Sequence, residues 1–538
     1  MAKFNVILFC GTSEKNTKTR NYGVARLATH IRECGYTCLV VNFSDELNWS
    51  NFIDILDLTM DENTYMVGLS CTFLPLRVVP LNSEQNSYQE YDSLYGQIKN
   101  FSDESKNTTT LINDLIYNKI DPWLNEIRKR NPKTKITCGG TAIASYLDIK
   151  NIDNFFYGLS ENMVIDYLNS LSGKGPKRIF NKVLDYDYKS QNSDWDFRSS
   201  KTIYSDYDFV TPNETLSLET SRGCRFSCSF CAFPMIGQKN LDDYVKFEEC
   251  LKSELIENYN KWGTTQYYIV DDTFNDTTEK LIRVKRVFDS LPFKIKFWCY
   301  ARIDIIAAHT EQIQLLKDMG LEEVFFGVET FHHKAGKTIG KGMKPEKIKQ
   351  ALAKCKEVWG DSVFITAGII VGLPYEPESS ILETVEYLSD PDCPIHAAWL
   401  HQLNIHDSKN PDPRIKYVYK SEYDRNYDKY GYYFESTETD IMNFTRWRKK
   451  DDGSGINSYE QALEISNRCN AMIPHKLTFD LYLQSLDHPI LSNRELCQQM
   501  GLEEYLKVKK TINQTKLYKE TIKNQYFDPL LKKLKNEG

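Results

Sequence analysis

Three cysteines stand close together in the middle of the chain, in the segment Ser221-Arg-Gly-Cys224-Arg-Phe-Ser-Cys228-Ser-Phe-Cys231. Thiolates at spacings of four and three residues on one loop can enclose a cube of iron and sulfide from one side. Three ligands leave the fourth iron without a protein ligand, and a small molecule can chelate it there. The spacing therefore predicts a 4Fe–4S cluster on Cys224, Cys228 and Cys231, with one open iron.

A structural zinc site is the alternative for these thiols. Closed zinc sites use four nitrogen or sulfur ligands, and the sequence has no histidine between His30 and His309. Cys250 is the nearby candidate for a fourth ligand, but it falls on the apolar face of an expected helix. We therefore favour iron over zinc.

The cysteine loop follows the first of several strands that alternate with helices. Apolar runs of strand length occur at 215–220, 266–270, 293–300, 323–329 and 364–372. A helix is expected near 245–262, and another carries Ile348, Ala351, Leu352 and Cys355 on one face before Gly360. Five strand–helix units in succession predict a partial barrel, of the (β/α)6 kind related to the TIM barrel.

Four more motifs follow the later strands in order: Asp271-Asp272-Thr-Phe274, Trp298-Cys-Tyr-Ala-Arg302-Ile-Asp304, Phe326-Gly-Val-Glu329 and Gly368-Ile-Ile-Val-Gly372-Leu-Pro374. Together with the Cys-x3-Cys-x2-Cys loop, they resemble the radical S-adenosylmethionine (SAM) superfamily over residues 213–390. A series of five motifs in family order is far more specific than any one of them.

The resemblance implies that SAM binds at the open iron. Six residues match positions that hold SAM in the superfamily: Phe230, Asp271, Asp272, Arg302, Glu329 and Gly372. The acidic pair would lie near the methionyl amino group, Arg302 near the carboxylate, and Gly372 behind the adenine. A barrel core position or a surface ion pair is the alternative for each residue alone. The implied chemistry is reductive cleavage of SAM to a 5′-deoxyadenosyl radical, with a one-electron reductant of the flavodoxin or ferredoxin type as partner.

Residues 1–172 also alternate strands with amphipathic helices. Apolar strands are expected at 5–10, 37–43, 66–73 and 135–140. This alternation predicts a doubly wound, Rossmann-like parallel sheet covered on both faces. Ligands of such sheets bind beyond the carboxyl ends of the strands.

This region resembles the cobalamin-binding-like domain that precedes the barrel in one branch of the superfamily. The matching pieces are Tyr22-Gly-Val-Ala-Arg-Leu-Ala-Thr-His30, Val67-Gly-Leu-Ser70, Cys138-Gly139-Gly140 and Tyr157-Gly158-Leu-Ser-Glu161. The resemblance implies cobalamin as a candidate cofactor, with contacts from Ser70, Gly139, Gly140 and Gly158. The Asp-x-His-x-x-Gly loop of methionine-synthase-type proteins is absent, and a long polar insertion separates Thr72 from Thr110. A domain that keeps the fold without the ligand is therefore the alternative.

Cys10, Cys71 and Cys138 end three of the expected parallel strands. Methylthiotransferases of the same superfamily carry a second cluster on three amino-terminal cysteines. The flanking residues here fit that family poorly, and buried strand-end cysteines are the favoured interpretation.

The other parts of the chain carry weaker signals. Residues 173–212 lack periodicity and predict a linker, which leaves 213–415 as the barrel. Residues 416–538 predict a mostly helical substrate cover that begins with a Tyr-rich stretch at 416–436. The net charge of −7 disfavours a nucleic-acid partner, and no apolar run approaches membrane-spanning length. We expect a cytoplasmic protein whose 14 cysteines are thiols or metal ligands.

The sequence thus predicts a radical SAM enzyme, with cobalamin-dependent methylation of an unactivated carbon in a small molecule or peptide as the favoured reaction. A cobalamin-independent rearrangement, cyclisation or sulfur insertion is the first alternative. A non-catalytic metal-binding protein is the remote one, because it leaves the ordered motifs unexplained.

Overall fold

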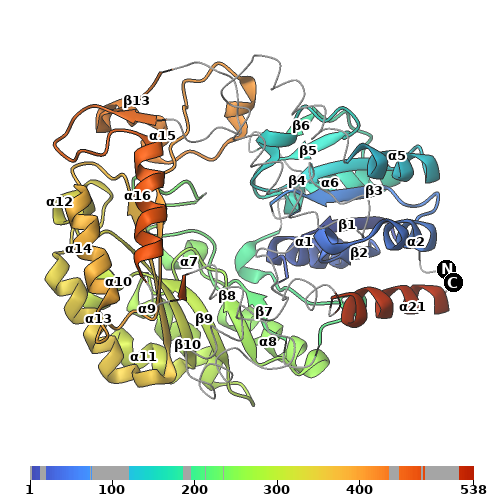
Figure 1. Ribbon diagram of the computed structural model, residues 1–538. Coiled ribbons are helices and arrows are strands. Elements are labelled where there is room, and N and C mark those ends of the chain that lie inside the picture. The colour runs from blue at the N-terminus through green and yellow to red at the C-terminus, as the bar shows by residue number, and fades with distance from the viewer. Residues whose placement is uncertain are drawn as a thin grey trace. The chain divides into compact units, whose positions relative to one another are not determined.

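The computed structural model describes residues 3–11, 20–72, 74, 120–185, 195–211, 214–233, 235–435, 447–473, 477–478, 520 and 522–537. The chain forms two compact units (Figure 1). The first contains residues 1–195, 202–211 and 508–538, and the second contains 196–201 and 212–507. The insertion after Thr72 lies mostly outside the described residues.

The first unit is built on a parallel sheet in the order β2-β1-β3-β4-β5-β6. Its strands are β1 (Val6–Cys10), β2 (Cys38–Val41), β3 (Met66–Ser70), β4 (Lys135–Gly139), β5 (Asn154–Phe156) and β6 (Val183–Leu184). Cys10 pairs in register with Ser70, and Ser70 with Gly139, so these strands end together. The strand order reverses at β1 and β3, which is where doubly wound sheets bind ligands. The predicted fold class of this unit is confirmed.

Helices cover both faces of this sheet: α1 (Tyr22–Glu33), α2 (Trp49–Thr59), α5 (Asp121–Arg130) and α6 (Glu161–Ser172). The Asn21 side chain caps α1 by accepting from Val24 N, and the apolar face of the helix packs on Val6 and Leu8. On the opposite face, Phe52 of α2 stacks on Trp123 of α5 with ring centroids 4.0 Å apart. Apolar residues on both sides explain why the strands read as continuous hydrophobic runs.

Two segments belong to the first unit although the sequence did not place them there. The expected linker supplies β6, in which Val183 pairs with Phe155, because a two-residue strand leaves no periodic signal. The carboxyl-terminal helix α21 (Asp528–Asn536) packs with α2 rather than over the barrel. Its apolar face buries Leu530 and Leu534. The sequence of the helix shows that this face needs a packing partner, but it does not show which element the partner is.

The second unit is built on a parallel sheet in chain order from β7 to β12. Its strands are β7 (Leu216–Leu218), β8 (Gln266–Ile269), β9 (Lys296–Ala301), β10 (Leu321–Glu329), β11 (Phe364–Val371) and β12 (Ala397–Gln402), and the two-residue β15 (Leu477–Thr478) extends it. Six parallel strands in sequential order, each followed by helical segments, confirm the predicted partial barrel. The five motifs lie at or directly after the carboxyl ends of β7 to β11.

The helices of this unit alternate with the strands (Figure 1). They are α7 (Leu241–Tyr244), α8 (Glu248–Trp262), α9 (Thr278–Asp289), α10 (Ile303–Ala308), α11 (Glu311–Met319), α12 (His333–Thr338), α13 (Pro345–Trp359) and α14 (Glu378–Ser389). Cys355 of α13 is fully buried, as expected for a small core residue.

A hairpin and two helices from the carboxyl-terminal part pack on the barrel. They are α15 (Glu422–Arg425), β13 (Tyr432–Phe434) with its antiparallel partner β14 (Trp447–Lys449), and α16 (Tyr459–Met472), which contacts β11 and β12. The expected cover is thus partly a hairpin. Among the described helices, none has the length and apolar character needed to cross a bilayer.

The first prediction concerns the attachment of the carboxyl-terminal helix. The buried Tyr526 hydroxyl accepts from Asn42 N (2.9 Å) and donates to Val40 O (3.0 Å) at the end of β2. Tyr526→Phe leaves two buried backbone groups unpaired, so the free energy of unfolding should fall by about 1–3 kcal/mol. Urea unfolding and proteolytic release of the carboxyl-terminal segment measure the change.

Tyr207→Phe is the matched control. Tyr207 also reaches the carboxyl terminus, through a contact to the exposed Glu537 carboxylate. Its loss should change stability by less than about 0.5 kcal/mol. Equal effects of the two substitutions would show that the buried Tyr526 bonds do not hold this helix.

Candidate active site

The three cysteines of the first motif lie on one loop that closes on itself. Cys224 N donates to Met235 O (3.1 Å), and Gln238 N donates back to Cys224 O (3.0 Å). Gly223 has φ 108°, and a Cβ at this position would strike Met235 O. Cys231 N donates to Cys228 O (3.0 Å), which folds the second half of the loop. The loop therefore presents all three thiols from the carboxyl end of β7.

The environment of these thiols suits ligands of a positively charged group. Cys224 and Cys228 are buried, and Cys231 is partly so. Burial raises the pKa of Cys224 above its ordinary value and that of Cys231 to about 11. Thiolates at these positions therefore need a cation beside them. No three His, Cys, Asp or Glu side chains in the described part of the chain converge on the position of a single metal ion.

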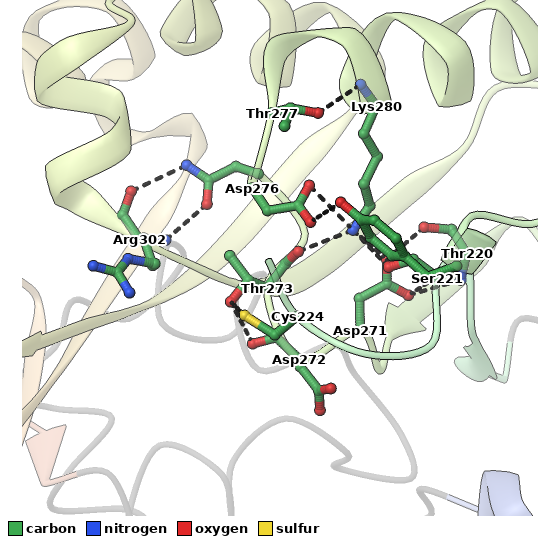
Figure 2. A network of polar contacts seen from close by, with 12 residues as sticks. Thr220, Ser221, Cys224, Asp271, Asp272, Thr273, Asp276, Thr277, Lys280 and Arg302 are labelled. Atoms are coloured by element: carbon green, nitrogen blue, oxygen red, sulfur yellow. Dashed lines mark hydrogen bonds and ion pairs between the residues drawn. The ribbon is translucent and has the colours of Figure 1, made fainter. Parts of the chain in front are cut away.

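A buried carboxylate ties the start of the cysteine loop to the next strand (Figure 2). Asp271 follows β8 and accepts four hydrogen bonds: from Thr220 N (2.7 Å), Thr220 Oγ1 (2.5 Å), Ser221 N (3.0 Å) and Ser221 Oγ (2.7 Å). Both carboxylate oxygens are thus engaged within the protein. Asp271 consequently holds the loop in place, and its predicted contact with SAM is not needed to explain it.

Lys280 of α9 completes this network. Its fully buried ammonium lies 3.0 Å from Asp271 Oδ2 and 3.8 Å from Asp276 Oδ1, and it donates to Ser221 Oγ (2.6 Å) and Thr273 O (2.9 Å). Burial alone lowers the pKa of Lys280, but the two carboxylates raise it, so the side chain stays charged. Tyr244 donates to Asp276 (2.7 Å). A cation between two carboxylates therefore lies directly beneath the loop.

Asp272 behaves differently from its neighbour. Figure 2 shows its carboxylate pointing away from the network. Burial, Asp271 and Glu219 raise the pKa of Asp272 to about 7. A nearby cation would stabilise the charged form of this carboxylate, and the predicted contact of Asp272 with the SAM amino group stays a prediction.

Arg302, at the carboxyl end of β9, contacts the cysteine loop directly. Nε and Nη2 form a bidentate pair with Asp304 (3.0 and 2.6 Å), while Nη1 donates to Cys228 Sγ (2.9 Å). The guanidinium carbon lies 4.0 Å from the centre of the Phe226 ring. Burial raises the pKa of Asp304, but Arg302 outweighs it and lowers that pKa below its ordinary value. The predicted contact of Arg302 with the SAM carboxylate stays a prediction.

Glu329 ends β10 in a strained conformation. Its φ of 66° lies in the left-handed region, which is uncommon for a residue with a side chain. Lys341 donates to Glu329 Oε1 (3.0 Å) and to Gly327 O (2.5 Å), and a Cβ at Gly327 would collide with both side chains. The lysine and the glycine together hold the carboxylate at the strand end.

The structure gives less support to SAM contacts for the two remaining candidates, Gly372 and Phe230. Gly372 follows β11 with φ 99°, and a Cβ there would lie 3.0 Å from Trp447 Cζ2. The ring of the carboxyl-terminal hairpin therefore accounts for this glycine without a ligand. Phe230 is partly buried within the cysteine loop.

In the first unit, the cobalamin candidates meet at adjacent strand ends. Ser70 ends β3 and accepts from Asn21 Nδ2 (3.2 Å), while Gly139 ends β4 beside it. Gly140 has φ 126°, and a Cβ there would strike Thr72. Gly158 follows β5 with φ 92°. Small residues at these ends fit a flat ligand, although Thr72 alone explains Gly140.

Cys10, Cys71 and Cys138 do not face one common point. Cys10 shares the α1 face of the sheet with Ser70, and its thiol contacts Asn42 Oδ1 (3.5 Å). Cys138 is in register with Leu69, on the opposite face with Phe9. Burial raises the pKa of Cys138, and the adjacent Cys71 adds to the rise. This arrangement matches the favoured interpretation of buried strand-end thiols.

A comparison with known protein families supports the superfamily that the sequence motifs resemble. Residues 218–388 match the Radical SAM superfamily. The second unit therefore contains a radical SAM domain, and this superfamily uses SAM and a 4Fe–4S cluster.

Relatives match part of the chain at low identity. Oxygen-independent coproporphyrinogen III oxidase of Helicobacter pylori is 26% identical over 240 residues, which cover 40% of this chain and 51% of that protein. Hopanoid C-3 methylase of Methylococcus capsulatus is 24% identical over 161 residues, 30% of this chain and 28% of that one. The chain thus spans about half or less of the length of these relatives.

Solved structures share the two-unit fold. The radical SAM methyltransferase TsrM of Kitasatospora setae superposes with a TM-score of 0.52 at 13% identity, over 74% of both chains. The cobalamin-dependent radical enzyme OxsB superposes with a TM-score of 0.50 at 15% identity, over 99% of this chain and 80% of that one. At these identities the likeness concerns the fold.

Several residues of the site escaped the sequence analysis: Thr273, Asp276, Lys280 and Lys341. Lys280 and Lys341 lie in helical or loop segments rich in lysine, where nothing distinguishes a buried lysine from a solvated one. The one sequence feature that could have indicated the Lys280 ion pair is the spacing of Lys280, four residues after Asp276 at the start of a helix.

The second prediction tests the buried network beneath the cysteine loop. Lys280→Met leaves Asp271 and Asp276 as unpaired buried carboxylates, which should cost about 3–5 kcal/mol. The loop should then hold its metal less well. We expect lower iron content after anaerobic reconstitution and faster loss of iron to a chelator.

Lys285→Met on the same helix is the control. Lys285 pairs with Asp289 at the surface (2.6 Å), and such pairs contribute about 0–1 kcal/mol. Iron retention in Lys280→Met equal to that in Lys285→Met would refute the role assigned to Lys280.

Proposed function

We propose that this protein is a radical SAM enzyme that cleaves SAM reductively at a 4Fe–4S cluster on Cys224, Cys228 and Cys231. The single observation that carries the proposal is the closed three-cysteine loop with the Arg302 guanidinium 2.9 Å from one of its thiols. When bound and reduced, the cluster supplies the electron that generates the 5′-deoxyadenosyl radical. The protein's own residues bind and orient SAM and keep water away.

Each SAM-binding role follows from the environment of the residue. Asp272 is the partner of the amino group, because its carboxylate is free of the Asp271 network. Glu329 is held at the strand end by Lys341 and reaches the polar atoms of the ligand. Arg302 keeps one N–H, on Nη1, after binding Asp304, Cys228 and Gly340, and this group would donate to the SAM carboxylate. Phe230 and Gly372 would then contribute apolar walls.

The favoured reaction is methylation of an unactivated carbon with cobalamin in the first unit. A corrinoid there would carry a methyl group between SAM and the substrate. The fold likeness to TsrM, which is described as a methyltransferase with cobalamin and a 4Fe–4S cluster bound, supports this reaction. Ser70 and Gly139 at adjacent strand ends would border the corrinoid.

A cobalamin-independent radical reaction is the second candidate. The contact of Gly140 with Thr72 favours it, because that glycine then needs no ligand. Coproporphyrinogen oxidase shows that relatives of comparable similarity include a protein named as an oxidase.

The partners and the location are part of the same proposal. We propose a flavodoxin or ferredoxin as reductant and a small molecule or peptide as substrate. The net charge of −7 disfavours nucleic acid, and the cytoplasm is the proposed compartment.

The third prediction tests the proposed reaction as a whole. Anaerobically reconstituted protein should bind about four irons and four sulfides per chain. On reduction it should release 5′-deoxyadenosine from SAM. The Cys224→Ala/Cys228→Ala/Cys231→Ala variant should do neither. Zinc without iron in the reconstituted wild type would refute the proposal.

The same preparation separates the two reactions. Protein made with hydroxocobalamin should retain about one corrinoid per chain, since the sheet has one switch point. Retention should be lost in Gly139→Trp, with iron unchanged. If the wild type retains no corrinoid and its visible spectrum does not change when corrinoid is added, the cobalamin-independent reaction replaces methylation as the proposed function.

The fourth prediction concerns pH. With a pKa of about 7, the Asp272 carboxylate is charged above pH 7 and becomes protonated as the pH falls below it. Only the charged form pairs with a ligand ammonium. Its contribution to SAM affinity should therefore fall roughly ten-fold between pH 8 and pH 6. Calorimetric titration at several pH values measures this dependence.

Asp272→Asn should bind SAM more weakly at pH 8 and lack this component of the pH dependence. Asp361→Asn is the control, because Asp361 is exposed and precedes β11 at the opposite end of the barrel. A profile of Asp272→Asn that parallels the wild type would remove Asp272 from the binding site.

A further inference from the structure

A strongly basic segment follows β10. Residues 332–357 contain eight lysines and two glutamates, and they form α12, the turn after it and most of α13. Lys334, Lys337, Lys344, Lys347 and Lys354 are exposed. The chain as a whole has a net charge of −7. A concentrated positive region on an acidic protein calls for a local explanation.

This segment touches the cysteine loop. Ser229 Oγ donates to Thr338 O (2.9 Å), and a Cβ on Gly340 would lie 3.9 Å from Cys228 Cα. Arg302 Nη2 donates to Gly340 O (3.4 Å). Gly340 itself is exposed. The backbone of this turn therefore lies between Cys228 and the solvent.

The lysines that flank this contact differ from those farther along α13. Lys337 precedes Thr338, and Lys344 caps α13 four residues after Gly340. No ion pair is found for either lysine among the described residues. In contrast, Lys354 pairs with Glu357 (2.7 Å) and Lys356 with Asp361 (2.6 Å). The positive charge is thus left uncompensated where the segment meets the cluster loop.

The cluster loop adds a third cation. Arg225 is exposed, directly after Cys224, and it also lacks an ion pair within the described residues. Exposed cations without an ion pair among the described residues thus stand on the cysteine loop itself and on the segment that contacts it, and they add positive charge there. Such local charge steers an oppositely charged partner toward it.

We propose that the surface formed by Arg225, Lys337, Gly340 and Lys344, here called the basic edge, is where an acidic electron-carrier protein docks to reduce the cluster. The inference rests on the proposed function. In this step the carrier loses one electron and the cluster gains one, and no atom or proton is transferred. Because the whole chain repels an acidic protein, the basic edge determines where that protein can approach. Gly340 lets its backbone come near Cys228 with no side chain between them.

The test compares reduction of the cluster by a protein and by a small reductant. Full-length Lys337→Glu/Lys344→Glu protein is reconstituted with its cluster and mixed anaerobically with reduced flavodoxin, an acidic flavoprotein, at low ionic strength. Stopped-flow bleaching of the cluster absorbance gives the rate. We expect a rate roughly ten-fold or more below that of the wild type. Reduction by dithionite should be unchanged.

Two controls make the result specific to this surface. Lys294→Glu makes the same kind of charge change at an exposed lysine before β9, at the amino end of the strands. It should leave flavodoxin reduction near the wild-type rate. The wild-type rate should also fall with added salt, more steeply than that of the double variant.

The outcomes distinguish the two proposals. Equal flavodoxin rates in the wild type and the double variant, or equal slowing in Lys294→Glu, overturn the basic edge as the docking site. A double variant that is slow with dithionite as well shows damage to the cluster and also overturns it. A wild-type protein that assembles no cluster overturns the proposed function instead.

Discussion

The active site depends on a buried lysine between two carboxylates. The cysteine loop makes isolated bridges at Ser221 and Cys224, and its start is held by Asp271, which receives four hydrogen bonds from Thr220 and Ser221. A carboxylate buried in this way is stable only with a cation at hand, and Lys280 provides it. In this network, two acidic side chains share one buried lysine. Cys224, Cys228 and Cys231 would hold an iron–sulfur cluster on this loop, and Arg302 donates to the thiol of Cys228 (2.9 Å).

At the carboxyl end of β10 the backbone is strained, whereas the residues after β8 are held by a buried charge network. Glu329 holds a left-handed backbone conformation that costs roughly 1–3 kcal/mol and persists only when its surroundings enforce it. Lys341 enforces it through Glu329 Oε1 and Gly327 O. The same turn leads on to Gly340 and the basic edge. The segment that holds the Glu329 carboxylate therefore also contacts the cysteine loop, through Thr338 and Gly340.

The fold was largely predictable from sequence because its signals are local. Continuous apolar strands, helical stripes and the order of the five motifs all depend on residues close together in the chain. The parts that escaped prediction depend on pairing across the chain. The two-residue β6 is a strand only because it lies beside β5, and α21 is placed by Leu530, Leu534 and the Tyr526 hydroxyl rather than by its neighbours in sequence. In the site, the motifs predicted roles for Arg302 and Glu329, but the contacts of these side chains with Cys228 and Lys341 depend on the fold.

Two motif glycines show why a motif match alone does not establish a ligand contact. Gly140 and Gly372 both suggested close approach to a cofactor, yet Thr72 and Trp447 fill the space that a side chain would need. Each glycine is required by the fold itself, so neither distinguishes a ligand-binding domain from one that kept only the architecture. Ser70 is more informative, because its hydroxyl accepts from Asn21, the residue that also caps α1. That bond joins the end of β3 to the start of the first helix across the switch point of the sheet. Because this bond lies at the strand ends where the resemblance predicts cobalamin, Asn21 and Ser70 would report on a bound corrinoid more directly than Gly140 or Gly372.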